Sequence, residues 1–373
     1  MDADERAAWL RLLLTPNLGP RTARQLLGAF GLPQQVLAAG RAALRERVAD
    51  DLADQLASDP TDTVAAALAR SEAWLAGPGD RWLLTFADAD YPPALLATPD
   101  PPPVLFAWGT RTALAQPAIA IVGSRSCTQQ GRETAAAFAQ ALAHAGLTIV
   151  SGLAVGIDAA AHRGALQAAE EGAAATTIAV AGTGIDVIYP SGQRALSETI
   201  RQRGLLLSEF APGMPALPHN FPRRNRIIAG LARGVLVVEA ALRSGSLITA
   251  RLAADFGREV LAIPGSIHSP TARGCHRLIK EGARLVENAR DVLEELRMDG
   301  ALVPRERRGE TTGGALGDQQ RRLLDALGRD PVTLDQLAAR CAADAGTISA
   351  TLLELELAQH VERLPGNRYQ RLR

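Results

Sequence analysis

The sequence predicts an α/β protein: a Rossmann-like, doubly wound, mainly parallel sheet between a helical N-terminal domain and a C-terminal winged-helix domain. Three observations predict this fold class. Residues 118–296 repeat a short apolar segment, a glycine turn and an amphipathic helical segment. Residues 6–75 carry apolar side chains three and four positions apart, as helices do. Residues 319–369 have the pattern of three helices and a hairpin. Alternating strands and helices favour a parallel sheet covered on both faces.

Changes in composition set the expected domain limits. The chain has 373 residues, which is too long for one ordinary core. We expect a helical domain like a SAM or helix-hairpin-helix unit, an extended Rossmann-like core, a linker and a winged-helix domain. Their expected limits are 1–80, 81–297, 298–317 and 318–373.

The first domain contains a glycine turn that feeds a helix, at residues 17–27. It resembles half of a helix-hairpin-helix unit, whose turn amides can meet a DNA phosphate. A plain helical connection is the alternative. Two proline-rich stretches, 90–93 and 100–103, then exclude a helix running across them.

The core is expected to contain short strands that are apolar on both faces, as buried parallel strands are. They are Ile119–Val122, Leu147–Val150, Thr177–Ala181, Leu205–Leu207, Val235–Glu239, Glu259–Ile263 and Arg284–Val286. In such sheets ligands bind at the carboxyl ends of the strands.

The last domain is expected to be a winged helix, with helices over 319–327, 333–341 and 345–357 and a hairpin with a Pro-Gly-Asn turn. Its third helix carries Glu354 and Glu356 but no arginine or lysine, which disfavours reading of the DNA major groove. A protein-contact or dimer role is the alternative for this domain.

Composition excludes several classes of protein. No run of about 18 apolar residues occurs, so no membrane insertion is expected. The N-terminus is acidic, unlike a signal peptide. Cys127, Cys275 and Cys341 are too far apart in sequence for a disulfide framework or a local metal site. We therefore expect a reduced, cytoplasmic protein with no metal.

The charge distribution indicates a localised anion site, although the formal net charge is zero. No acidic residue occurs between Glu209 and Glu239 or between Asp100 and Glu133, yet arginines occur in both windows. Lys280 is the only lysine of the sequence, so arginine, with its forked donors, must supply the phosphate contacts.

Glycine-rich turns follow the expected strands at one sheet edge, where backbone amides and helix N-termini favour anions. The turn residues that we expect to bind are Gly123, Ser124, Arg125, Gly152, Gly182, Gly184, Ser244, Gly245 and Ser246. The first turn is not Gly-x-Gly-x-x-Gly, no acidic residue follows the second strand, and no P-loop motif is present. The sequence therefore predicts a phosphate-binding edge with no nucleotide cofactor.

The densest signal is the segment Phe221–Arg226, where Pro222 marks a helix start. Arg223, Arg224 and Arg226 then oppose the helix dipole, which favours an anion as their partner, with Asn225 between them. Ion pairs with Glu209, Glu239 or Asp255 are the alternative. Phe221 either packs in the core or stacks on a base.

Asp158 and His162 lie four residues apart, on one face of an expected helix. A structural hydrogen bond or helix cap is favoured over a metal or acid–base pair. Ser124, Ser151 and Ser244 have no visible His/Asp relay, so no nucleophile is predicted.

Taken in order, these motifs resemble the DprA/Smf family over about Asp90–Val286. The residues that carry the resemblance are Val122–Arg125, Ser151–Ala154, Gly156–Asp158, His162, Gly182–Gly184, Tyr189, Pro190, Ser208, Glu209, Phe221–Ile228, Ser244–Ser246, Thr249, Ala250, Pro264, Gly265, Leu278, Ile279, Gly282 and Ala283.

The resemblance implies a DNA-processing protein of natural transformation. Such a protein binds and protects incoming single-stranded DNA (ssDNA), helps to load the RecA recombinase, and forms a homodimer through its Rossmann-like core. The motif match places Gly123–Arg125 and Phe221–Arg226 on the family's ssDNA pocket. Arginines here replace the lysines that the family often supplies.

Two rival functions are considered. The related Lonely-guy nucleotide phosphoribohydrolases carry a catalytic glutamate where this chain has Thr249. Without that carboxylate no group is placed to support cleavage of the glycosidic bond, so we expect no enzyme. The other rival is a nucleotide-binding module.

Overall fold

The computed structural model describes residues 1–298, 317–328, 330–341, 343–358, 360–366 and 368–372. The chain forms two compact units, which are treated separately below: Met1–Cys127 with Gly131–Pro304, and Thr128–Gln130 with Arg305–Arg373. The expected linker, 298–317, lies outside the described residues apart from Met298 and Gly317. Within the described ranges, no helix combines the length and apolar character needed to cross a membrane.

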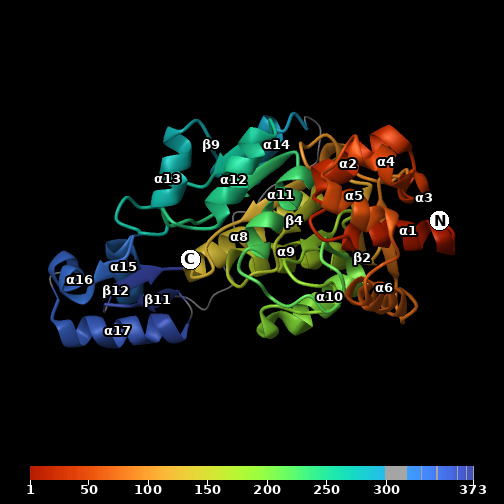
Figure 1. Ribbon diagram of the computed structural model, residues 1–373. Helices are drawn as coiled ribbons and strands as arrows, with labels where there is room; N and C mark the ends of the chain where they lie inside the picture. Colours follow the sequence, from red (N-terminus) through yellow and green to blue (C-terminus); the bar gives the residue numbers. More distant parts are fainter. Residues whose placement is uncertain (299–316, 329, 342, 359, 367, 373) are drawn as a thin grey trace. The chain divides into compact units, whose positions relative to one another are not determined.

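The N-terminal segment is helical, as the apolar spacing predicts (Figure 1). Its helices are α1 (Ala3–Leu14), α2 (Pro20–Phe30), α3 (Pro33–Ala38), α4 (Gly40–Arg45), α5 (Asp50–Ala57) and α6 (Asp62–Leu75). Asp2 caps α1 by accepting the backbone N–H of Glu5, and α2 begins at Pro20, a residue suited to a first turn. Leu12, Leu26 and Leu44 share a small core of these helices.

One nine-stranded sheet organises the rest of this unit, in the order β1-β2-β6-β5-β4-β3-β7-β8-β9. Its strands are β1 (Arg81–Thr85), β2 (Val104–Gly109), β3 (Ala118–Val122), β4 (Thr148–Ser151), β5 (Thr177–Val180), β6 (Leu205–Ser208), β7 (Gly234–Val237), β8 (Glu259–Ala262) and β9 (Arg284–Leu285). All neighbouring strands in the part of the sheet ordered β6-β5-β4-β3-β7-β8-β9 pair in parallel. The predicted mainly parallel sheet is therefore confirmed. The sequence reasoning missed β1 and β2, which pair antiparallel with each other and, through β2, with β6.

Helices cover both faces of the sheet. They are α7 (Pro93–Leu96), α11 (Asn220–Leu231), α12 (Ser246–Asp255) and α13 (Arg273–Lys280) on one face, and α8 (Gln129–His144), α9 (Ile157–Glu170), α10 (Arg194–Arg203) and α14 (Ala289–Glu295) on the other. The 3₁₀ turns are η1 (Arg111–Leu114) and η2 (Ser191–Gln193). Ile119 and Ile121 face the α8 side, whereas Ala120 and Val122 face the α11 side, as strand alternation requires.

The strand order places a topological switch point at β3. The chain leaves β3 toward β4, β5 and β6, and later returns on the other side of β3 as β7, β8 and β9. The loop after β3 leads to α8 and the loop after the neighbouring β7 leads to α12 on the opposite face, so a crevice opens between the carboxyl ends of these two strands. Open α/β sheets bind their ligands in such a crevice. The predicted turns therefore belong to the edge of the sheet that is suited to a binding site.

The C-terminal unit has the predicted winged-helix layout. It contains α15 (Asp318–Leu327), β10 (Val332–Thr333), α16 (Leu334–Cys341), α17 (Ala345–Leu357), β11 (Val361–Leu364) and β12 (Arg368–Arg371). The strands form a small sheet in the order β10-β12-β11, and apolar residues of all three helices share one core. Asn367 of the predicted Pro-Gly-Asn turn is not among the described residues.

Candidate nucleic-acid interface

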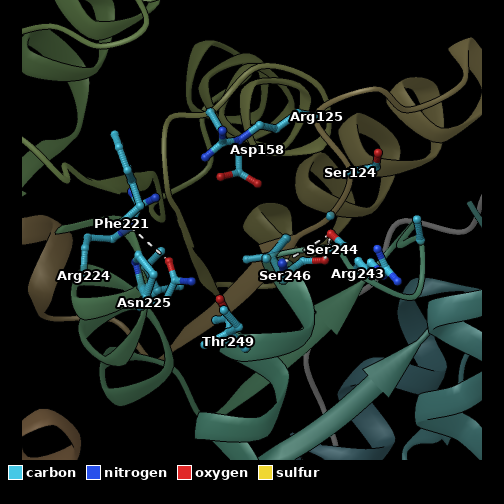
Figure 2. Close-up of a pocket in the computed structure, with 18 of the residues that line it drawn as sticks. Ser124, Arg125, Asp158, Phe221, Arg224, Asn225, Arg243, Ser244, Ser246 and Thr249 are labelled. Carbon is cyan, nitrogen blue, oxygen red and sulfur yellow. Dashed lines mark hydrogen bonds between the residues drawn. The ribbon is translucent and has the colours of Figure 1, made fainter. Parts of the chain in front are cut away.

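A cavity of about 670 Å³ opens at the carboxyl end of β3, between the loops that follow β3, β4 and β7. Figure 2 shows Asp158 on α9, Phe221, Arg224 and Asn225 on α11, and Thr249 on α12 around it. Of the predicted residues, those that line the cavity are Gly123, Ser124, Arg125, Phe221, Arg224, Asn225, Ser244, Gly245 and Ser246. The cavity thus lies at the topological switch point of the sheet, where open α/β folds bind their ligands.

Arg125 is the most accessible cation contributed by the β3 loop. It is exposed, its guanidinium carbon lies 5.7 Å from the centre of the Phe221 ring, and in the described part of the chain it has no ion pair. The preceding residues fix the loop, because the Ser124 N–H donates to the Glu239 carbonyl (2.7 Å). Gly123 is required there, since a Cβ atom would lie 2.8 Å from the same carbonyl oxygen. Arg125 is therefore held at the cavity rim without a carboxylate partner.

Arg224 lies at the floor of the cavity and is held there by the β4 and β5 ends. It is 4% exposed, and one guanidinium nitrogen donates to the Gly152 carbonyl (2.6 Å) and to the Val180 carbonyl. Its Nε donates to Asn225 Oδ1 (3.2 Å). Burial lowers the pKa of Arg224 to about 10, so the side chain remains cationic at neutral pH. The guanidinium makes the floor of the cavity positive.

Asp158 is the single carboxylate among the described lining residues, and it is occupied by its own loop. One carboxylate oxygen accepts the Gly152 N–H (3.1 Å), and Ser151 and Ala154 also bond to this carboxylate. Burial raises the pKa of Asp158, and the nearby Arg224 guanidinium opposes that shift. The Gly152 amide is thus taken by Asp158, and Gly152 itself does not line the cavity.

An aromatic pair forms one side of the cavity. The Tyr189 and Phe221 rings lie 5.4 Å apart at a 40° tilt, and Tyr189 is half exposed. Gly182 makes room for the pair, since a Cβ there would lie 2.7 Å from the Phe221 ring. Gly184 is also outside the cavity lining, and its N–H donates to the Met214 carbonyl (2.9 Å). These glycines therefore shape the edge through packing.

The other two arginines of α11 have carboxylate partners. Arg226 is buried and pairs with Glu209, and it also donates to the Asp100 carbonyl (2.6 Å). Arg223 pairs with the other oxygen of Glu209 (3.0 Å). Neither arginine lines the cavity. The ion-pair alternative with Glu209 therefore accounts for both side chains in this structure, and Arg224 is the α11 cation that reaches the cavity.

Arg243 is a cavity residue that the sequence reasoning did not select. It is exposed, lies across the cavity from Phe221 (Figure 2), and has no ion pair within the described ranges. Its neighbours form a tight turn, in which Ser244 Oγ contacts Ser246 Oγ (2.7 Å) and accepts the Ser246 N–H (3.3 Å). Its position directly before the selected Ser244-Gly245-Ser246 turn was the signal that could have identified it.

His162 has no role in the cavity. It is fully buried on α9, where its Nδ1 contacts Thr177 Oγ1 (2.7 Å), and burial lowers its pKa to about 3. Among the residues whose positions are described, no three His, Cys, Asp or Glu side chains gather as a metal site would require. Asp158 and His162 thus make separate structural hydrogen bonds, as the favoured interpretation of this pair expects.

Family comparisons agree over nearly the whole chain. The family model "DNA recombination-mediator protein A" matches residues 82–297, "DprA-like N-terminal HHH domain" matches residues 3–46, and "DprA winged helix domain" matches residues 310–367. Protein Smf of Escherichia coli is 43% identical over 308 residues, which cover 80% of this chain and 79% of that protein. DNA processing protein DprA of Streptococcus pneumoniae is 50% identical over 208 residues, covering 56% of this chain and 72% of that protein.

Solved structures show the same relationship. The structure of DprA from Streptococcus pneumoniae is 40% identical, with a TM-score of 0.58, and covers 74% of this chain and 97% of its own. The structure of DNA processing protein A from Helicobacter pylori is described as giving insight into its single-stranded DNA binding mode. It is 29% identical, with a TM-score of 0.52, and the match covers 59% of this chain and 97% of the Helicobacter pylori chain. The family model "DNA recombination-mediator protein A" matches more than half of the residues of this chain, and the chain therefore belongs to the DprA/Smf family.

Proposed function

We propose that this chain binds ssDNA in the cavity at the end of β3 by gripping the phosphate backbone. The observation that carries the proposal is Arg125, an exposed arginine without a carboxylate partner in the described chain, at the rim of a cavity with a cationic floor. The cavity's one described carboxylate, Asp158, is engaged by loop amides. Arg125, which has no carboxylate partner there, favours phosphate, and such contacts carry no sequence information.

The aromatic pair explains a preference for a single strand. Tyr189 and Phe221 present ring faces beside Arg125. Bases stack on such rings when they are free of a duplex, at about 1–3 kcal/mol each, and with little dependence on base identity. The pairing of a phosphate contact with a stacking surface thus suits ssDNA of any sequence. The ssDNA binding described for the Helicobacter pylori relative supports extending this function to the present chain.

Replacement of Arg125 tests the proposal. Arg125→Ala removes a phosphate contact, so affinity for oligo-dT at 0.1 M salt should fall about five-fold, and the slope of log affinity against log salt should become shallower by about 0.7. Fluorescence anisotropy over a salt series measures both. Arg290→Ala on α14 is the matched control, because it removes an exposed arginine that does not line the cavity. Equal affinities for Arg125→Ala and the native chain would reject the cavity as the site.

We further propose the cellular role that the family resemblance implies. The chain would protect incoming ssDNA and help to load RecA during natural transformation, in the cytoplasm. Relatives named DNA processing proteins in Streptococcus pneumoniae and Bacillus subtilis support this role. Nuclease digestion of oligo-dT with and without the chain, and RecA filament assembly on coated ssDNA, test the two steps separately.

Covalent chemistry is not part of the proposal. Thr249 lines the cavity and is buried, and no carboxylate other than Asp158 is among the described lining residues. A hydrolase that releases a base needs a carboxylate free to act on the sugar or on water, and Asp158 is bonded to Gly152. Incubation with nucleoside monophosphates should release no free base. Release by the native chain that Asp158→Asn abolishes would establish the rival hydrolase.

We also propose that the chain forms a homodimer through its Rossmann-like core. β9 (Arg284–Leu285) closes one end of the sheet order, so one side of this strand has no described strand partner. Leu285 on it is 49% exposed. An open strand edge with an exposed leucine favours pairing with a second copy.

A further inference from the structure

The loops after β3, β7 and β8 are joined by backbone hydrogen bonds. The Ser124 N–H of the β3 loop donates to the Glu239 carbonyl after β7 (2.7 Å). The next residue, Ala240, donates to the Thr271 carbonyl (2.6 Å) and accepts from the Gly274 N–H (2.7 Å), both in the segment after β8. Gly274 must lack a side chain, because its Cβ would lie 2.5 Å from the Ala240 carbonyl oxygen. The loops that follow β3, β7 and β8 are thus bonded to one another, and we call this surface, from Ser124 through Ala240 to Gly274, the ledge.

An exposed arginine follows each of these strand ends: Arg125 after β3, Arg243 after β7 and, as the first residue of α13, Arg273 after β8. Within the described ranges, none of the three is in an ion pair, unlike Arg223 and Arg226 of α11, which pair with Glu209. β3, β7 and β8 are adjacent in the sheet, so the first and third strand ends lie about 10 Å apart. Arg125 and Arg243 line the cavity, and the bonds of Ala240 to Thr271 and Gly274 hold the segment that carries Arg273 beside the β7 loop.

Exposed apolar side chains accompany these arginines. Leu242 directly precedes Arg243, Ile248 lines the cavity with Arg243, and both apolar side chains are more than two-fifths exposed. Ile267, in the loop after β8, is 74% exposed, which is more than any other large apolar side chain described. Apolar groups beside unpaired cations suit a strand whose bases and phosphates both need contacts.

The opposite direction along the sheet edge is acidic. The loop after β5 carries Asp186, and the residue after β6 is Glu209. Asp186 accepts the Gly213 N–H (2.8 Å), and Glu209 pairs with Arg223 and Arg226. On that side the exposed arginine without an ion pair among the described residues is Arg194, which begins α10 beyond the turn η2 and does not line the cavity. A phosphate backbone that leaves the cavity is therefore favoured toward β8.

We propose that the strand bound in the cavity continues over the loops after β7 and β8, with a phosphate on Arg243 and a further one on Arg273, and with a base against Ile267. This inference rests on the proposed function, because it extends the same ssDNA site. In this proposal the bound DNA strand runs from the aromatic pair, on the β5 side of the cavity, to Arg273 on the β8 side. The strand must therefore be long enough to reach from Phe221 to Arg273.

Oligonucleotide length separates the extension from the cavity. Anisotropy is measured with labelled dT4, which we expect to occupy the cavity alone, and with dT12, which we expect to reach Arg273. Arg273→Ala should weaken dT12 binding about five-fold at 0.1 M salt and leave dT4 binding unchanged, because one phosphate contact is lost only on the longer strand. Ile267→Ser should likewise affect dT12 alone. Arg290→Ala controls for the loss of one positive charge.

The outcomes distinguish the two proposals. If Arg125→Ala weakens both oligonucleotides but Arg273→Ala and Ile267→Ser weaken neither, the strand does not follow the ledge, and the cavity site stands. Equal losses on dT4 and dT12 for Arg273→Ala would place Arg273 in the cavity contact itself and would also overturn the extension. If Arg125→Ala changes neither oligonucleotide, the proposed function fails first.

Discussion

His162 illustrates how a buried side chain couples this core to pH. The imidazole lies in the interior of the molecule, with Nδ1 against Thr177 Oγ1 and with Nε2 buried and unbonded. Since Thr177 Oγ1 donates to the Ile149 carbonyl, it accepts the proton of Nδ1. Protonation of Nε2 would bury a charge, so the folded state keeps the ring neutral and its pKa falls from 6.5 to about 3.

The stability of the core should therefore fall as the pH falls below 6.5. Below pH 6.5 the imidazole of His162 becomes protonated in the unfolded chain but stays neutral in the folded chain. Between pH 7 and pH 5 this difference lowers the free energy of unfolding by about 2 kcal/mol. His162→Asn places an amide donor toward Thr177 without a titrating group and should flatten this difference. Urea unfolding of both proteins at pH 7 and pH 5 measures it. Parallel losses in the two proteins would contradict the assignment.

Gly152 is expected to be intolerant of a side chain. A Cβ atom there would lie 2.6–2.7 Å from the guanidinium of Arg224, which is packed against the Gly152 and Val180 carbonyls. Gly152→Ala should cost about 1–3 kcal/mol of folding free energy and displace Arg224 from the cavity floor. Gly245→Ala, also in the cavity, is the control, since nothing lies within 4 Å of its Cβ. Equal unfolding curves for the two variants would disprove this role.

At the residue scale, Gly152 and Gly182 show which features the sequence predicts and which it does not. The sequence predicts Gly152 and Gly182 at the right sheet edge, because small residues follow each strand. It assigns them to phosphate contact. In the structure they make space for Arg224 and Phe221 of α11, which lie far along the chain. No local pattern reveals which remote side chain fills the space beside a glycine.

At the scale of elements, the parallel strands were predictable and the antiparallel ones were not. β3 to β8 are short, mainly apolar runs between helices, which one sequence window suffices to recognise. β1 and β2 flank the proline-rich passage, and only their pairing with each other and with β6 makes them strands. Pro222 predicted the start of α11 for a local reason and to within two residues, since the helix begins at Asn220. The Glu209 partner of Arg226, in contrast, depends on tertiary packing.

The edge strand β9 should determine the state of association. Leu285→Arg places a charge on the open strand and should convert a dimer into monomers, because pairing would bury that charge. Leu353→Arg, at an exposed leucine on α17 of the other unit, is the control. Light scattering coupled to size exclusion measures the mass of each. A dimer that survives Leu285→Arg would require an interface elsewhere.

At the scale of the whole molecule, the ssDNA site is expected to be independent of the winged-helix unit. Every residue of the proposed cavity and ledge belongs to the unit that contains the sheet, and the domain limits proposed from sequence place that sheet within 81–297. A fragment of residues 1–297 should therefore fold and keep most of its affinity for oligo-dT. Complete loss of binding by a fragment that still unfolds cooperatively would show that the site includes the winged helix.

The central claim is that this family member holds a single strand by its phosphates at the switch point of its sheet. A crystal structure of the full chain with oligo-dT tests it most directly. The account predicts a phosphate within hydrogen-bond distance of Arg125, a base stacked on the Tyr189–Phe221 pair, and the strand running on toward Arg273. A strand bound to the N-terminal helices or the winged helix, with the cavity at the end of β3 free of DNA, would contradict it.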